Sequence, residues 1–161
     1  MDAVEILMME HSGIRLISSN NLLNTDMARL LNFYKFLDGN HVAVEEHIVF
    51  PEIRLYSPES AKLLDRLIAD HKLIEKLFTN LIKWNENEDP LFKIRLPLFY
   101  KILTEHNALE EAEIFKSWVK VDQESRIKSL KEINDLIVSN NIDNYMHETG
   151  VSREQMRYIF G

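Results

Sequence analysis

The chain has 161 residues, is 45% hydrophobic and carries a formal net charge of −7. This length fits one domain with a substantial core, and the absence of cysteine excludes disulfides, thiolate metal sites and cysteine nucleophiles. The acidic balance, with no cluster of Lys or Arg, argues against nucleic-acid binding. Only four Gly and four Pro are present, and because these residues interrupt helices, their scarcity favours long helices.

Four helices are predicted in the first 120 residues, because apolar side chains recur there at helical spacing. Their expected ranges are about 2–23, 26–55, 57–84 and from 89 onward. Thr25 or Asp26 is expected to cap the second helix and Ser57 the third, while Pro51 is expected to kink the end of the second. Pro97 either kinks the fourth helix or marks its start.

The start of the chain lacks the basic and apolar regions of a signal peptide. No apolar run approaches the ~20 residues that a membrane-spanning helix needs. We therefore expect a cytoplasmic protein with no membrane partner.

Short connections between the predicted helices make an all-α, up-down-up-down four-helix bundle the natural architecture. The expected division is the bundle over residues 1–120 and a C-terminal helical extension over residues 121–161 packed on it. One or two extra helices are predicted in the extension, at 123–138 and at 152–160, the latter capped by Ser152. The extension is interpreted as a brace on the bundle, with partner binding as the alternative.

A histidine lies at the centre of the apolar stripe of each predicted bundle helix, and a charged residue follows it four places later on the same helix face. The histidines are His11, His41, His71 and His106, and the charged residues are Arg15, Glu45, Glu75 and Glu110. The segments 41–50 and 106–115 share His, Ala, Glu, Glu and Phe at matching places. The bundle is therefore two similar helical hairpins, each with one His and one His-x-x-x-Glu.

A single buried histidine usually belongs to a hydrogen-bonded core, and a single His-x-x-x-Glu is commonly an exposed surface pair. Three carboxylates and four imidazoles on four inward faces are not explained by packing, because each unpaired buried carboxylate costs several kcal/mol. Cations would balance them. Nitrogen and oxygen donors without sulfur suit iron or manganese, and zinc is a further alternative. The pattern therefore predicts a shared dinuclear site, with open positions for dioxygen, nitric oxide or peroxide.

Over about residues 2–118 the chain resembles the hemerythrin-like (HHE cation-binding) family. The residues that carry the resemblance are His11, His41-x-x-x-Glu45 with the following Ile-Val-Phe-Pro, His71, and His106-x-x-x-Glu110. The resemblance implies a four-helix bundle that holds two iron ions with a bridging oxo or hydroxo group. It also implies that Glu45 and Glu110 bridge the irons and that the four histidines are terminal ligands.

Two departures separate the chain from the oxygen-carrying hemerythrins. Those proteins have a histidine where this chain has Glu75, and His-x-x-x-x-Asp where this chain has His106-x-x-x-Glu110. The resemblance is closer to relatives linked to the sensing of iron, oxygen or nitric oxide and to the repair of iron centres. Glu75 is expected either to bind one iron as a seventh ligand or to pair with Arg15 across the bundle.

The predicted function is a non-haem di-iron protein that binds or senses dioxygen, nitric oxide, peroxide or iron. The alternatives are a di-iron enzyme (a peroxidase, nitric-oxide reductase or oxidase), an iron-centre repair protein, or a module whose metal stabilises the fold. A protein partner or a homodimer stays open. Glu46 and Glu111 are expected on the solvated surface, with support of a metal-binding histidine as the less favoured role. Tyr34 is expected in the core.

Overall fold

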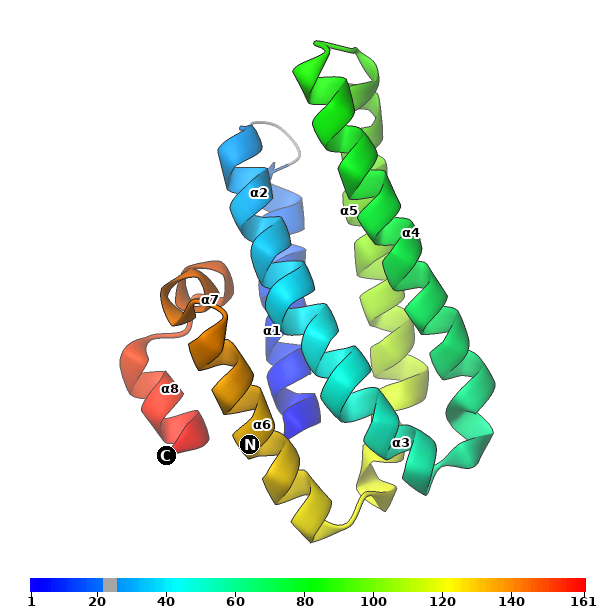
Figure 1. The fold of residues 1–161 in the computed structure, drawn as a ribbon, viewed down its shortest axis with the longest axis vertical. Coiled ribbons are helices and arrows are strands. Elements are labelled where there is room, and N and C mark those ends of the chain that lie inside the picture. The colour runs from blue at the N-terminus through cyan, green and yellow to red at the C-terminus, as the bar shows by residue number, and fades with distance from the viewer. Residues whose placement is uncertain (22–25) are drawn as a thin grey trace.

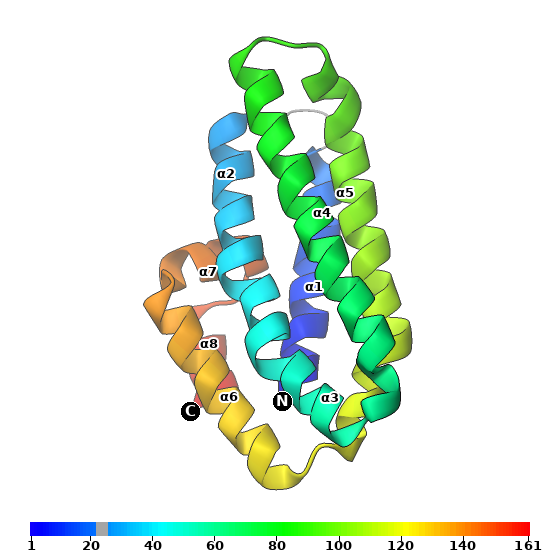
Figure 2. The ribbon, with the colours of Figure 1, turned by 45° about the vertical axis from the view of Figure 1, so that its right-hand side comes forward.

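Four long helical segments run alternately up and down the molecule and form a bundle (Figures 1 and 2). The structure, a computed structural model, describes residues 1–21 and 26–161, and these residues form helices and no strand. The bundle comprises α1 (Ala3–Asn21), α2 (Met27–Phe36), η1 (Leu37–Val42), η2 (Glu45–Val49), α3 (Phe50–Tyr56), η3 (Pro58–Ser60), α4 (Ala61–Glu86), α5 (Leu91–Leu109), η4 (Glu110–Ile114) and η5 (Phe115–Lys120). The predicted all-α bundle is confirmed.

The second and fourth segments contain π-helical turns, in which a backbone hydrogen bond spans five residues instead of four. The N–H of Phe50 bonds the carbonyl of Glu45, and the N–H of Phe115 bonds the carbonyl of Glu110. η2 and η4 therefore begin at matching glutamates of the two hairpins. Pro51 follows η2 in the first turn of α3, where its missing N–H interrupts the regular ladder. The 3.6-residue apolar pattern does not predict these turns.

Local signals at the helix ends explain most of the boundaries. The Asp26 side chain accepts a hydrogen bond from a backbone N–H in the first turn of α2 and caps this helix as predicted, while Thr25 lies outside the described residues. The prediction that Ser57 caps the third helix is wrong, because the chain first makes the short η3 turn and the Ser57 hydroxyl donates to a neighbouring carboxylate. Pro97 lies inside α5, so the fourth helix begins before it.

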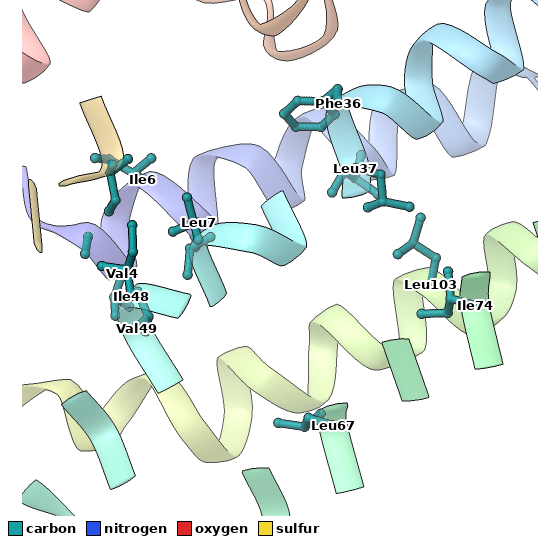
Figure 3. Close-up of a cluster of buried hydrophobic side chains, with 14 of the residues drawn as sticks. Val4, Ile6, Leu7, Phe36, Leu37, Ile48, Val49, Leu67, Ile74 and Leu103 are labelled. Atoms are coloured by element: carbon teal, nitrogen blue, oxygen red, sulfur yellow. The ribbon is translucent and has the colours of Figure 1, made fainter. Parts of the chain in front are cut away.

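The core between the four segments consists of aliphatic and aromatic side chains (Figure 3). In that view Leu7, Leu37, Leu67 and Leu103 come from α1, η1, α4 and α5, and all four are buried. Complete burial of a side chain of this size stabilises the fold by about 1.5–3 kcal/mol. The apolar layers exclude water from the polar residues that lie between them near the middle of the bundle.

The C-terminal extension (residues 121–161) lies along the side of the bundle formed by α1 and α2 (Figures 1 and 2). It contains α6 (Gln123–Ser139), α7 (Ile142–Thr149) and α8 (Arg153–Phe160), one helix more than the sequence predicts. α6 and α7 contact α1, α7 also contacts α2, and α8 contacts α6. Ser152 caps α8 as predicted, with Gln155 completing a capping box. Across the described residues, no helix combines the length and apolar character that crossing a bilayer requires.

Candidate metal centre

Six polar side chains converge in the middle of the bundle, and each is buried. They are His11 from α1, His41 from η1, Glu45 from η2, His71 from α4, His106 from α5 and Glu110 from η4. The structure thus brings together every predicted ligand except Glu75. Because the four segments are held by apolar layers above and below, the six side chains face one another and not solvent.

Glu45 divides its two carboxylate oxygens between two groups of histidines. Its Oε1 lies 3.6 Å from His11 Nε2 and 3.3 Å from His41 Nε2. Its Oε2 lies 3.2 Å from His71 Nε2. A carboxylate that faces different nitrogen donors with each oxygen has the arrangement of a bridge between two cations.

Glu110 repeats this arrangement from the opposite hairpin. Its Oε2 lies 3.4 Å from His11 Nε2, and its Oε1 lies 3.1 Å from His106 Nε2 and 3.9 Å from His71 Nε2. The six side chains therefore form two overlapping groups that share both glutamates, with the donor atoms of each group within 4.8 Å of one another. We call the group with His11 and His41 position A, and the group with His71 and His106 position B.

Most of the atoms that face the two positions lack a hydrogen-bond partner, the exceptions being the Nε2 atoms of His71 and His106, which contact each other at 2.9 Å. The Nε2 atoms of His11 and His41 and both oxygens of Glu45 and Glu110 are buried without a hydrogen bond. Such orphaned polar atoms are costly in a protein interior unless something coordinates them. Two imidazole nitrogens and shared carboxylates at each position form a donor set that suits iron, manganese or zinc. The residues present therefore fit a pair of metal ions.

Carboxylates occupy the other side of the histidine rings. The pairs are His11 Nδ1 with Glu111 at 2.9 Å, His41 Nδ1 with Glu10 at 2.8 Å, His71 Nδ1 with Glu46 at 2.7 Å, and His106 Nδ1 with Asp70 at 3.7 Å. A carboxylate only accepts hydrogen bonds, so the Nδ1 atoms of the first three rings carry the proton and donate it. This fixes the tautomer that presents the lone pair of Nε2 to a metal.

Glu46 and Glu111 are partly exposed, and each contacts a histidine, which is the less favoured of the two roles that the sequence analysis gives them. Each directly follows one of the two shared glutamates and reaches a histidine of the other hairpin. The reason is tertiary: in the bundle the neighbouring helix places the edge of an imidazole next to a face that a lone helix would expose. The signal that could have found them was their matching place in the repeated segments.

Sequence reasoning missed Glu10 and Asp70. Each directly precedes the first histidine of its hairpin and faces the second histidine of the same hairpin. The repeated acidic residue before His11 and His71 was the available signal. With these residues included, the two hairpins supply closely similar sets of ligands and supporting carboxylates.

Glu75 belongs to neither group. Its side chain is exposed and lines a pocket between η1, η2 and α4 that also borders Tyr34. Arg15 forms its ion pair with Glu111 at 2.8 Å, so the predicted pairing of Arg15 with Glu75 is wrong. The physical reason is that Glu75 faces the gap between α4 and η1, whereas Arg15 faces α5 and its continuation. Tyr34 is half-buried and stacks on Phe78, with ring centroids 3.6 Å apart.

The buried glutamates change the protonation of the histidines. Burial alone lowers the pKa of His11, but hydrogen bonds and charge from Glu110 and Glu45 outweigh burial and raise this pKa to about 10. Burial likewise lowers the pKa of His71, and the Glu45 carboxylate outweighs it and raises this pKa to about 9. Burial raises the pKa of Glu45, but the imidazoles of His41, His11 and His71 hold it well below its usual range. Positive charge is therefore strongly favoured between these carboxylates.

A pocket of about 430 Å³ borders the centre on one side. Of the six convergent side chains, His71 lines it, together with the supporting Glu46. His71 is 6% exposed, whereas His11 is fully buried and His41 is 1% exposed. Position B is therefore closer to solvent than position A.

The match to a family model agrees with this geometry. The model of the hemerythrin HHE cation-binding domain matches residues 2–118, which include all six convergent side chains and both π turns that begin at the shared glutamates. Comparisons with curated proteins and with solved structures gave no match. The extension lies beyond the matched residues. The family match agrees with the helical bundle, the paired histidines and the shared glutamates. The chain therefore belongs to the hemerythrin family and carries its HHE cation-binding domain.

Proposed function

We propose that the six convergent side chains hold two iron ions, with an oxo or hydroxo bridge, and that the protein binds or senses a small oxidant or iron itself. The observation that carries this proposal is the division of the oxygens of Glu45 and Glu110 between the two pairs of histidines. Both carboxylates would then be ligands that the two cations share. When bound, a pair of irons supplies one- and two-electron redox chemistry toward small oxidants.

The donor set favours iron or manganese over zinc. Structural zinc sites in proteins use four ligands and often thiolates, and this chain has no cysteine. Two imidazoles and two shared carboxylates at each position leave room for further small ligands on a metal that takes five or six. Manganese accepts the same donors, so the metal content decides between them.

The pocket beside His71 supports the binding of a small molecule. It borders Glu46 and His71 of position B, and its volume of about 430 Å³ admits dioxygen, nitric oxide, peroxide or azide. Asp38, Glu46 and Glu75 outnumber Lys72 in its wall. This acidic balance favours neutral ligands and cations over large anions. Iron entering the site and a diatomic ligand reaching it would use the same route.

The test is metal content together with an absorption spectrum of protein purified in air. We expect iron at both positions and near-ultraviolet charge-transfer bands that change when azide or peroxide is added. Glu75→Gln is the matched control, because it removes a carboxylate from the pocket wall but not from the convergent set. Protein that binds zinc alone, or no metal after reconstitution with ferrous iron, would overturn the redox role.

A further inference from the structure

The C-terminal extension reaches the metal centre through one side chain. The Tyr145 hydroxyl on α7 donates a hydrogen bond to Glu10 Oε1 at 2.7 Å. The other oxygen of this carboxylate, Glu10 Oε2, accepts the Nδ1 proton of His41 at 2.8 Å. Tyr145 and Glu10 are fully buried and His41 nearly so. A continuous, solvent-free hydrogen-bond chain thus joins α7 to a histidine of position A.

Several contacts fix the position of α7 against the bundle. The Tyr145 ring packs edge-on against Phe36, with ring centroids 5.8 Å apart. Asn144 donates to the carbonyl of Asn32 at 3.3 Å. A Cβ at Gly13 would lie 3.5 Å from the backbone of α7, an ordinary van der Waals distance, so α1 packs directly against α7 at this point. The direction of the Tyr145 hydroxyl therefore follows from how α7 packs.

The second hairpin is built differently at the equivalent place. Asp70 corresponds to Glu10, but its side chain is 32% exposed and lies 3.7 Å from His106 Nδ1, a nitrogen without a hydrogen-bond partner. The two hairpins thus carry closely similar ligands but differ in the carboxylate that faces the Nδ1 atom of the second histidine. Position A has a buried carboxylate held on both oxygens, whereas position B has a shorter, partly exposed one.

We propose that Tyr145 is a positioning residue for His41, so that packing of the extension controls how tightly position A binds metal. This inference rests on the proposed metal centre. The hydroxyl holds Glu10 in the orientation in which it accepts the His41 Nδ1–H, and this proton keeps Nε2 free as a donor. Coupling is reciprocal, so a cation at position A also stabilises α7 on the bundle.

The test compares Tyr145→Phe with Tyr158→Phe, a matched change at an 88% exposed tyrosine of the same extension. Phe keeps the ring packing and removes only the hydroxyl. In titrations with Co²⁺ followed by visible absorption, we expect Tyr145→Phe to weaken one of the two binding steps by about tenfold, in the range known for partners of metal-binding histidines. His41→Ala and His106→Ala assign the steps to positions A and B. Tyr158→Phe should change neither step.

Hydrogen exchange supplies a second readout, which measures the coupling between α7 and position A directly. In the parent protein, Co²⁺ should slow exchange of the amides of α7, and in Tyr145→Phe this metal-dependent protection should disappear. Glu10→Gln should weaken the same binding step, whereas Asp70→Asn should act on position B. Equal weakening of both steps by Tyr145→Phe, or no change in either, would overturn the proposal.

The metal-binding results also distinguish failure of this inference from failure of the proposed function. Binding of Co²⁺ but not of iron overturns the di-iron role and leaves the positioning of His41 fully testable. If the parent protein binds neither metal, the metal centre is wrong, and the nitrogen-15 spectrum of metal-free protein decides the positioning. A His41 Nδ1–H signal that shifts in Tyr145→Phe but not in Tyr158→Phe supports it, and an unchanged signal overturns it.

Discussion

The Nε2 atoms of His71 and His106 lie 2.9 Å apart, and each also faces a carboxylate oxygen, of Glu45 at 3.2 Å and of Glu110 at 3.1 Å. Two imidazole nitrogens at this separation need a proton or a cation between them. The nearby carboxylates favour positive charge at this point. The contact between the two histidines is therefore, like the ligand set, evidence that position B can hold a cation.

Substitution of Glu45 or Glu110 should affect both positions, whereas substitution of a histidine should affect one. We expect Glu45→Ala to abolish stoichiometric metal binding, because both cations lose a shared ligand, and His106→Ala to leave one metal ion per chain. Elemental analysis of reconstituted protein measures this. Retention of one full equivalent by Glu45→Ala would show that Glu45 is not shared.

The supporting carboxylate on His71 should tune metal affinity without being a ligand. Glu46→Gln removes the charge that holds the His71 Nδ1 proton at 2.7 Å, so we expect metal affinity to fall about 10–100-fold. Glu75→Gln, in the same pocket wall, is the matched control and should bind metal normally. Competition with a chelator measures both affinities, and similar losses in the two variants would contradict the assignment.

Removal of metal should destabilise the bundle. At free metal of about 100 times the Kd, one bound ion adds about 2.7 kcal/mol to the free energy of unfolding. For a chain of this length, each kcal/mol of added unfolding free energy raises Tm by about 2–4 °C. Thermal unfolding followed by circular dichroism, with and without chelator, measures the shift. An unchanged Tm would mean that metal does not bind preferentially to the folded state.

Narrowing the pocket should slow access to position B and leave metal content unchanged. Ala43 lines the pocket beside His71, and Ala43→Phe would fill part of this space. We expect azide to bind the metal-loaded protein severalfold more slowly, as followed by stopped-flow absorption. Leu73→Phe, at an exposed leucine of α4 outside the pocket lining, is the control. Equal azide rates in both variants would place the route elsewhere.

The metal-free fold should lose stability as the pH rises. The pKa of His11 is raised to about 10 and that of His71 to about 9 from an ordinary value of 6.5, since the charge of Glu110 and Glu45 outweighs burial. A raised pKa contributes stability that is complete below pH 6.5 and is lost as the pH passes the folded pKa. Urea midpoints of metal-free protein should therefore fall between pH 7 and 10.

The metal-loaded protein is the control for this pH dependence. Metal takes the place of the protons on the Nε2 atoms. The urea midpoint of the metal-loaded protein should therefore vary less over the same pH range. A metal-free midpoint that rises with pH would show that the buried histidines are neutral in the folded protein.

The ligand set could be predicted from the sequence because it depends on spacing within single helices. His41 with Glu45 and His106 with Glu110 are four residues apart, and any α-helix places such pairs on one face. His11 and His71 lie in apolar stripes, which fixes their direction toward the core. The bundle itself follows from the same periodicity and from the short connections.

The contacts between helices were decided only by the tertiary structure. Glu46 and Glu111 support histidines of the opposite hairpin, and Tyr145 meets Glu10 across more than half the chain. No periodicity within a helix encodes which face of a neighbour it will touch, so the sequence placed Glu75 at the site and left Glu46 outside. The sequence thus determined which side chains can bind metal, and packing decided which carboxylates hold them in place.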